Sequence, residues 1–393
     1  PLKKLAALPG LSRREREEIV LATAELLRAG VDEAKWMPQL EATYAELAAY
    51  LTRFPYRDDR LRAYMRLYTR CKVMNEASAE LLALGQTWAN ERTLWDWRAR
   101  ADLLRGDTRT PRHWVDGLGV EWAGLLGSLL NDEHIQAEVA LGRAELPTST
   151  GFNRDWQPDE SVERDLDLIA HAYSYSYPSA LVQQLDWISA LANKLRDECL
   201  ARGSFIVSGD HGLTRFAHQG QRVSPPAGCE VHKWGRYATL AEGIPAPESN
   251  AWRVYNNCLV LAGHSLFEGG RVPIGGEAHG GATIEESLVP VLRLALRRRE
   301  LPRIVSCDPR VRMSARGQGE LMIELSGPVA ELWVSIASRV FAAERRGDAQ
   351  WIIALSDLQA GRWRARIECD LGLIDEIEIE IRRGIAQDDM GLL

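Results

Sequence analysis

Five polar residues of this 393-residue chain stand directly after apolar runs or within a glycine-rich loop. Asp116 follows HWV, Thr150 follows ELPTS, Asp210 and His211 follow FIVSG, and His279 lies in IGGEAHGGAT. Open α/β sheets bind their ligands at such positions, beyond the carboxyl ends of the strands. The five residues supply hard oxygens and imidazole nitrogens but no thiolate. This donor set suits Zn²⁺ or Mn²⁺ in a hydrolytic role better than it suits a structural zinc.

Each of these residues, taken singly, also has an ordinary structural interpretation. Asp-Gly is a common turn dipeptide, which accounts for Asp116 and, less readily, for the Asp210–His211 pair before a glycine. Thr150 is a candidate helix N-cap before GFNRDW, and His279 is a candidate loop histidine. Their joint occurrence in this order favours a functional site.

The segment around these residues alternates extended runs with helical ones. RHWV, IQAEVALGRAELP, SFIVSG and WRVYNNCLVLAG read as strands, whereas VEWAGLLGSLLNDE, ESVERDLDLIAHAYSY and PSALVQQLDWISALANKLRDECLARG have helical spacing. Strands that alternate with helices predict an α/β layer fold with a largely parallel sheet.

The two flanking segments differ from this pattern. Residues 1–108 carry apolar residues at helical spacing, as in SRREREEIVLATAELLRAG, and predict a helical N-terminal domain. Residues 301–393 alternate apolar and polar residues with a period of two, as in DEIEIEIRR, and predict a small antiparallel β-sandwich with a structural or docking role. The catalytic α/β domain is then expected at residues 109–300.

Composition narrows the classes of function. A net charge of −7 argues against a surface that binds nucleic acid throughout, although it allows a local basic groove. The six cysteines form no CxxC pair and no zinc-ribbon spacing, which indicates reduced thiols and a cytoplasmic location. Since no apolar run reaches the length of a membrane span, we expect no membrane partner.

Five short motifs, in their order and spacing, resemble the alkaline phosphatase superfamily and, within it, the PglZ family of bacterial phage-defence (BREX) systems. The motifs are VDGLG, LPTSTGFN, LDLIAHAYSYSYPSALVQQLDWI, IVSGDHGLTRF and EAHGGATIEESLVPVL, all within residues 112–295. The last one is especially PglZ-like, with His-Gly-Gly followed by an acidic pair and LVPVL. The resemblance covers roughly half of the chain and implies an alkaline-phosphatase-like, mostly parallel sheet flanked by helices.

The resemblance also implies a nucleophile and a first metal site. Thr150 would be the nucleophile, in a Pro-x-x-Thr-x-x-Asn pattern that ends at Asn153. Asn153 would bind a non-bridging phosphoryl oxygen. Asp116, Asp210 and His211 would bind one metal ion together with Thr150.

A second metal site is implied at His279. Asp167 and His171 have the spacing of the remaining two ligands, and four residues along a helix place both side chains on one face. Ala170 stands where the family usually has glycine before the histidine. Four further residues are candidates for contacts with phosphate oxygens, or else ordinary surface residues: Arg215, His232, Lys233 and Arg236.

The expected function is metal-dependent hydrolysis of phosphoric esters, of the phosphodiesterase or nuclease type, with one or two Zn²⁺ or Mn²⁺ ions. The expected partners are a phosphoester substrate, with nucleic acid as a candidate, and other BREX proteins. Two alternatives stay open. One is a phosphomonoesterase, which would require extra positive groups for the phosphate dianion. The other is a non-catalytic scaffold subunit of a defence complex. A sulfatase is less favoured because no cysteine stands at the nucleophile position.

Overall fold

The computed structural model describes residues 1–90, 93–107, 110–171, 176–271, 276–297, 301–347 and 349–383. The chain divides into two compact units, Pro1–Arg297 and Arg298–Leu393, each with its own hydrophobic core. All the residues predicted to form the site belong to the larger unit. Among the described residues, no helix combines the length and the apolar character that crossing a bilayer requires.

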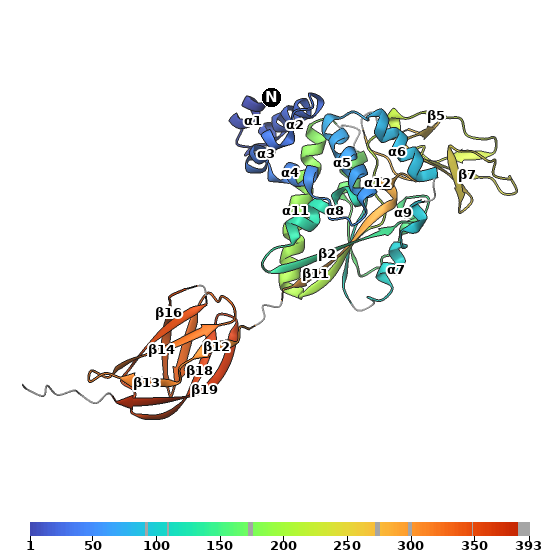
Figure 1. Ribbon diagram of the computed structural model, residues 1–393. Helices are drawn as coiled ribbons and strands as arrows, with labels where there is room; N and C mark the ends of the chain where they lie inside the picture. Colours follow the sequence, from blue (N-terminus) through green and yellow to red (C-terminus); the bar gives the residue numbers. More distant parts are fainter. Residues whose placement is uncertain are drawn as a thin grey trace, which may run out of the picture. The chain divides into compact units, whose positions relative to one another are not determined.

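The larger unit begins with a helical region, at the blue end of the colour bar in Figure 1. Its helices are Leu2–Ala7 (α1), Arg13–Arg28 (α2), Glu33–Lys35 (η1, a 3₁₀ turn), Met37–Thr43 (α3), Ala45–Thr52 (α4), Asp59–Met74 (α5), Ala79–Asn90 (α6), Thr93–Asp96 (η2, 3₁₀) and Arg100–Leu104 (α7). Local sequence sets several of their ends. Ser12 and Glu15 form a capping box before α2, Asp58 caps α5, and Asn75 ends α5 in the left-handed conformation.

A five-stranded sheet in the order β2-β11-β4-β1-β3 forms the centre of the larger unit. Its strands are Arg112–Val115 (β1), Ile135–Arg143 (β2), Ser161–Glu163 (β3), Ser204–Gly209 (β4) and Leu288–Leu296 (β11). β1 runs parallel to β3 and β4, but β11 runs antiparallel to β2 and β4. The sheet is mixed, so the prediction of a mostly parallel, alkaline-phosphatase-like sheet is wrong. The buried run LVPVL in β11 is apolar on both faces, and such a run does not specify strand direction.

Helices and smaller strands surround this sheet. They are Val120–Leu130 (α8), Thr150–Asn153 (α9), Asp165–His171 (α10), Ser179–Arg202 (α11), Ala217–Gln219 (η3), Arg222–Val223 (β5), Cys229–Val231 (β6), Tyr237–Leu240 (β7), Trp252–Tyr255 (β8), Cys258–Leu261 (β9), Leu266–Phe267 (β10) and Ile284–Ser287 (α12). The strands between β4 and β11 in the sequence form two smaller sheets. One is an antiparallel sheet in the order β6-β7-β9-β8, and the other is the pair β10-β5.

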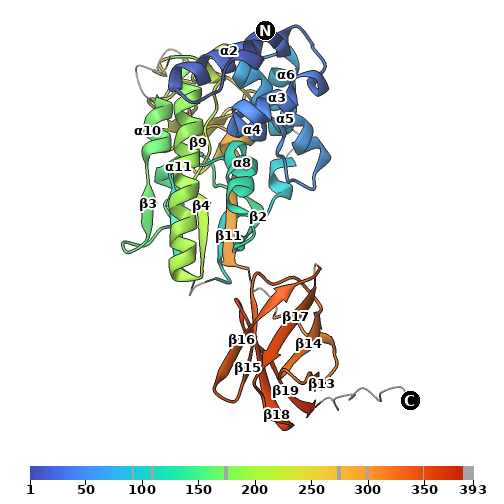
Figure 2. The same ribbon diagram turned by 90° about the vertical axis from the view of Figure 1, so that its left-hand side faces the viewer.

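The two faces of the main sheet bury different neighbours. Val115 and Val207 join the core formed with α8 and α11, and Figure 2 shows these two helices lying along β4 and β11. Trp114 and Ile206, one residue earlier in each strand, pack instead with Leu104 of α7. Successive residues of a strand point to opposite faces, so both faces of this sheet are covered.

The smaller unit is one curled eight-stranded sheet in the order β12-β14-β17-β16-β15-β18-β19-β13. Its strands are Ile304–Cys307 (β12), Arg310–Met313 (β13), Gln318–Leu325 (β14), Leu332–Ile336 (β15), Arg339–Arg345 (β16), Gln350–Ser356 (β17), Gly361–Cys369 (β18) and Gly372–Arg383 (β19). All these pairings are antiparallel except that of β13 with β19. The predicted sandwich of two separate sheets is therefore replaced by one continuous sheet. A period of two identifies the buried face of each strand, but it does not say where one sheet ends.

Candidate metal centre and nucleophile

The carboxyl ends of two neighbouring strands bring the first three predicted ligands together. β1 and β4 are parallel and pair Val115 with Gly209, so the residues that follow, Asp116 and Asp210, leave the sheet side by side. His211 comes next, and all three residues are buried. Their ligand atoms lie within 4.8 Å of one another, which is a spacing that could hold a metal ion.

Asp210 is fixed by one carboxylate oxygen and presents the other. Its Oδ1 accepts hydrogen bonds from the backbone N–H of His211 at 2.9 Å and of Gly117 at 3.1 Å. Its buried Oδ2 accepts no hydrogen bond from any described residue. Because a buried carboxylate oxygen without a partner is costly, this atom fits a metal ligand.

His211 is oriented by its own loop. Its Nδ1 lies 3.1 Å from the carbonyl oxygen of Gly212, so in the neutral ring Nδ1 carries the proton and Nε2 presents its lone pair. That Nε2 lies 3.5 Å from Asp116 Oδ1 and 3.5 Å from Asp210 Oδ2. The orientation of the ring therefore suits coordination through Nε2.

A second group of potential ligands shares His211. Ligand atoms of Asp167, His211 and His279 lie within 4.8 Å of one another, and His279 Nε2 is 3.9 Å from Asp167 Oδ1. His171, one turn along α10, places its Nε2 3.0 Å from the same Asp167 oxygen. The ring of His171 stacks on Trp234, with ring centroids 4.2 Å apart. The structure thus brings the residues predicted for the second site to the edge of the first.

Thr148, to which the sequence analysis assigned no role, holds His279 in place. His279 Nδ1 lies 3.1 Å from the carbonyl oxygen of Thr148, which leaves Nε2 directed at the ligand group. The Thr148 hydroxyl accepts a hydrogen bond from Gly280 N–H at 3.0 Å and donates one to the Gly281 carbonyl at 2.6 Å. The segment that carries Thr150 is therefore tied to the loop that carries His279.

Thr150 lies beside the first ligand group. It is the first residue of α9, and Ser149 occupies the N-cap position, so Thr150 is not the helix cap. Its Oγ1 lies 3.2 Å from His211 Nε2 and donates a hydrogen bond to Asp116 Oδ1 at 3.4 Å. The hydroxyl is in contact with two members of the first ligand group.

The side chain of Asn153 forms hydrogen bonds with the backbone of the segment that precedes Thr150. Its amide group donates to the carbonyl oxygens of Glu145 at 2.9 Å, Pro147 at 3.3 Å and Ser149 at 3.2 Å. Its Oδ1 accepts from the Glu145 N–H at 2.7 Å, and the residue is buried. The structure thus uses this side chain to shape the turn before Thr150.

The pKa values of the buried groups are displaced by their mutual charges. Burial, and then the charge of Asp210, raises the pKa of Asp116 to about 7. Burial lowers the pKa of His211, but the carboxylates of Asp210 and Asp116 outweigh it, so that the pKa is raised above its usual value. Burial and the charge of His211 hold the pKa of His279 well below its usual value. Such crowding of carboxylates and imidazoles is what a bound cation would relieve.

The acidic pair of the last motif, Glu285 and Glu286, accepts hydrogen bonds from the loop that follows Asp210 and His211. Glu285 Oε1 lies 2.7 Å from His264 Nε2, and the Glu285 carboxylate accepts hydrogen bonds from Thr214 and Tyr64. The carbonyl oxygen of Glu286 accepts from the N–H of Gly212 at 2.8 Å. In the sequence this pair is visible only as part of the motif EAHGGATIEESLVPVL, and both residues are fully buried.

The two arginines predicted as candidate phosphate contacts are engaged elsewhere. Arg236 pairs with the carboxylate of Glu286 at 2.6 Å, and Arg215 donates to the Gly276 carbonyl at 3.3 Å and to Asn75 Oδ1 at 2.7 Å. Both guanidinium groups are buried in these contacts.

The other two candidates lie on the turn between β6 and β7. His232 stacks on Tyr237, and burial together with Lys233 lowers the pKa of His232 to about 4. Lys233 is exposed, with its Nζ 4.5 Å above the ring of Trp234, the residue that stacks on His171.

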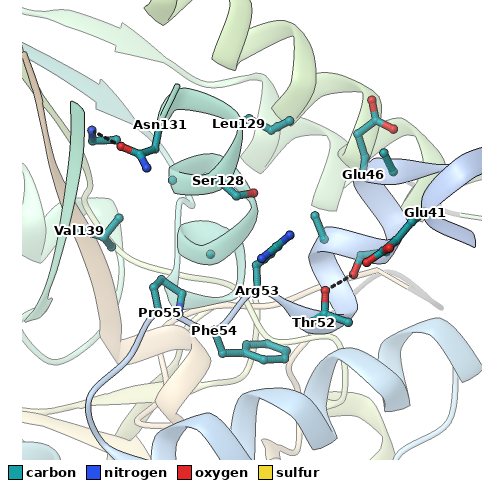
Figure 3. Close-up of a pocket in the computed structure, with 16 residues that line it drawn as sticks. Glu41, Glu46, Thr52, Arg53, Phe54, Pro55, Ser128, Leu129, Asn131 and Val139 are labelled. Carbon is teal, nitrogen blue, oxygen red and sulfur yellow. Dashed lines mark hydrogen bonds between the residues drawn. The ribbon is translucent and has the colours of Figure 1, made fainter. Parts of the chain in front are cut away.

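A cavity of about 870 Å³ lies apart from these residues, between α4, α8 and β2 (Figure 3). Small residues such as Ala49, Gly124 and Gly127 line it together with Arg53 and Phe54. None of the residues predicted for the metal centre lines this cavity.

Comparisons with known proteins identify no family. No family model matches the chain, and no curated protein matches it. One similar solved structure is a phosphonoacetate hydrolase from Sinorhizobium meliloti in complex with phosphonoformate, with a TM-score of 0.25 and 13% identity over 48% of this chain and 66% of that chain. Another is a superoxide reductase (neelaredoxin) from Ignicoccus hospitalis, with a TM-score of 0.15 and 18% identity over 21% of this chain and 81% of that one. At these TM-scores the likenesses carry no argument about fold or activity.

Proposed function

We propose that the chain is a metal-dependent hydrolase of phosphoric esters with Thr150 as its nucleophile. The observation that carries this proposal is the position of Thr150 Oγ1, 3.2 Å from His211 Nε2 and 3.4 Å from Asp116 Oδ1. Both of these atoms belong to the buried group that fits a metal ion.

We further propose a role as the PglZ component of a cytoplasmic phage-defence (BREX) system, with other BREX proteins and nucleic acid as partners. This part rests on the resemblance of the five sequence motifs.

Asp116, Asp210 and His211 would hold a Zn²⁺ or Mn²⁺ ion, whose positive charge would lower the pKa of the neighbouring Thr150 hydroxyl. Thr150 Oγ attacks the phosphorus atom, the bond from phosphorus to the ester oxygen breaks, and the departing alkoxide takes up the proton that the Thr150 hydroxyl releases. Asp116, which accepts the hydrogen bond of Thr150, is positioned to receive the hydroxyl proton. Water then cleaves the bond between Thr150 and phosphorus and restores the hydroxyl.

Asp167, His171 and His279 would hold a second ion beside the first. His171 and His279 present ring nitrogens toward the same Asp167 oxygen, at 3.0 Å and 3.9 Å. Paired cations at this edge of the sheet suit a phosphoryl group, because they neutralise charge on both the attacking and the leaving oxygen.

The engagement of Arg215 and Arg236 favours a diester substrate over a monoester. A terminal phosphate dianion calls for positive groups in addition to the metal, and guanidinium groups supply them best. In this protein Arg236 is neutralised by Glu286, and Arg215 is bound to Gly276 and Asn75. A phosphodiester carries a single negative charge and therefore needs fewer positively charged side chains around it.

Hydrolysis of bis-p-nitrophenyl phosphate in the presence of Zn²⁺ or Mn²⁺ tests the proposal. We expect Thr150→Ala and Asp210→Ala to reduce hydrolysis to background while the fold is kept, and Thr52→Ala, a matched threonine on α4, to leave it unchanged. Full activity in both site variants would show that the assignment is wrong. Parallel assays with p-nitrophenyl phosphate decide between diester and monoester.

Elemental analysis separates the enzyme from the scaffold alternative. A protein that contains no transition metal, and takes up none on titration, would favour a scaffold subunit. A phage-plating assay with the Thr150→Ala variant tests the defence role independently of the substrate used in vitro.

A further inference from the structure

One buried arginine joins the segment that carries the nucleophile to the segment that carries the metal ligands. Arg100, the first residue of α7, is 2% exposed. Its Nη1 donates hydrogen bonds to the carbonyl oxygens of Gly209 at 2.9 Å and Asp210 at 2.8 Å. Its Nη2 donates to the carbonyl oxygen of Asn153 at 3.0 Å and contacts the carboxylate of Asp155.

The acceptors of Arg100 adjoin the reacting groups on both sides. Asn153 is the last residue of α9, which begins at Thr150, and the Asp210 carbonyl directly precedes His211. The separation of Thr150 Oγ1 from His211 Nε2 therefore depends on how these two segments sit relative to each other. Gly209 is the last residue of β4 and Asp210 is the first residue beyond it, so the guanidinium supplies hydrogen bonds to two carbonyl oxygens at the end of this strand.

The shape of the arginine side chain matters here as well as its charge. Three backbone acceptors on two segments require a planar group with several N–H donors in a fixed geometry, which an ammonium group does not offer. The ring of Trp114, on β1, lies 5.1 Å from the Arg100 guanidinium carbon and limits where the plane can move. A lysine at this position would keep the charge beside Asp155 but would lose the connection between the segments.

We propose that Arg100 is a positioning residue that sets the distance between the Thr150 hydroxyl and the Asp210–His211 pair. The inference rests on the proposed function for its catalytic consequence, and on the hydrogen bonds alone for its structural consequence. It extends the working site into the N-terminal helical region, from which the sequence analysis took no site residue.

The test compares Arg100→Lys with a matched control, Arg293→Lys. Arg293 lies on β11 and anchors the other end of α7, through the Leu103 carbonyl at 2.8 Å and Asp107 at 2.7 Å, without touching either segment. In the assay with bis-p-nitrophenyl phosphate we expect Arg100→Lys to lower kcat by about tenfold to a hundredfold with little change in KM, since misplacing a reacting group by about 1 Å has an effect of this size. Arg293→Lys and Asp155→Asn should each change kcat by less than about threefold, as they leave the backbone contacts of Arg100 in place.

Amide hydrogen exchange provides a readout that does not depend on activity. We expect exchange at residues 150–153 and 210–213 to rise by about tenfold or more in Arg100→Lys but not in Arg293→Lys. Equal exchange in the two variants, or raised exchange with an unchanged kcat, would overturn the positioning role. If the wild-type protein hydrolyses no ester, the proposed function fails, while the exchange measurement still shows whether Arg100 joins the two segments.

Discussion

The rings of His211 and His279 stack with their centroids 4.1 Å apart and their planes 18° apart. His211 belongs to both candidate ligand groups, whereas His279 belongs only to the group with Asp167. Because Nδ1 of His211 faces the Gly212 carbonyl, its Nε2 offers one lone pair and can bind only one ion. Two ions in this centre would therefore divide the ligands, with Asp116, Asp210 and His211 at the first position and Asp167, His171 and His279 at the second. This arrangement makes the stoichiometry of metal binding a direct test of the layout.

Replacing either histidine should remove a ligand from one metal position and spare the other. We expect the wild-type protein to bind two Mn²⁺ or Zn²⁺ ions per chain and His279→Ala to bind one. His211→Ala should weaken binding at the first position by at least about tenfold, because it removes a ligand of that ion. Isothermal titration with elemental analysis measures both quantities, and the exposed His134→Ala serves as the control. Two ions bound with unchanged affinity in His211→Ala would contradict the assignment of His211 to the first position.

Gly212 is required because two other backbone segments approach it closely. A Cβ atom at this position would lie 1.9 Å from the Glu285 carbonyl oxygen and 2.8 Å from the Cα of Gly119. Gly212→Ala must push these segments apart, so we expect the free energy of unfolding to fall by about 1–3 kcal/mol. Urea unfolding measures this loss, and metal affinity should fall with it because His211 is the adjacent residue. Gly151→Ala, where no atom lies within 4 Å of the added carbon, should be nearly neutral. Similar losses in the two variants would contradict this packing argument.

The two loops that carry Asp116, Asp210 and His211 could be predicted from the sequence because each follows an apolar strand and carries its ligands within two residues of the strand end. That placement depends only on β1 and β4 being parallel neighbours, which they are. The direction of β11 does not enter it, so the wrong prediction for the sheet as a whole left Asp116, Asp210 and His211 correctly grouped.

The supporting residues could not be found in the same way. Arg100 reaches carbonyl oxygens more than a hundred residues away in the sequence, and nothing in WRARADLL distinguishes it from a surface arginine. Thr148 and Glu285 were visible in the motifs, but their roles depend on contacts between segments that meet only in the folded chain. Periodicity and turn residues report local structure, whereas these contacts are long-range.

His113 should make the larger unit less stable in mild acid. This histidine of β1 is 2% exposed. Burial lowers its pKa below the usual value, even though Glu198 and Glu163 act to raise it. The unfolded chain then binds the proton more readily than the folded one. Stability contributed by the neutral ring is present above the ordinary histidine pKa of about 6.5 and is lost as the pH falls below it.

Urea unfolding at pH 7.5 and 5.5 checks this expectation. The difference in unfolding free energy between the two pH values should be smaller in His113→Gln than in the wild type. The exposed His134→Gln should leave the difference unchanged. The same difference between the two pH values in His113→Gln and in the wild type would contradict the direction of the pKa shift.

Lys72 of α5 should be among the most sensitive positions in the chain outside the metal centre. Its ammonium group is 1% exposed and lies 2.6 Å from Glu121 Oε1 and 2.9 Å from Glu277 Oε1, with the ring of Trp122 at 4.9 Å. Removing this charge takes away the ammonium group that pairs with both buried carboxylates. We therefore expect Lys72→Met to lower the free energy of unfolding by about 3–5 kcal/mol, the cost of breaking a buried ion pair.

A second substitution distinguishes this electrostatic effect from lost packing. Adding Glu121→Gln to Lys72→Met removes one of the two carboxylates that pair with Lys72 and should recover part of the stability, since burial already raises the pKa of Glu121 to about 7.

Lys194→Met provides the matched surface control, because the Lys194–Glu163 pair is half-exposed and should be worth no more than about 1 kcal/mol. Because Glu277 lies two residues before His279, the Lys72 variant should also bind metal more weakly at the second position. A loss in Lys72→Met no larger than in Lys194→Met, or no recovery in the double variant, would show that the buried charges are not what holds this region together.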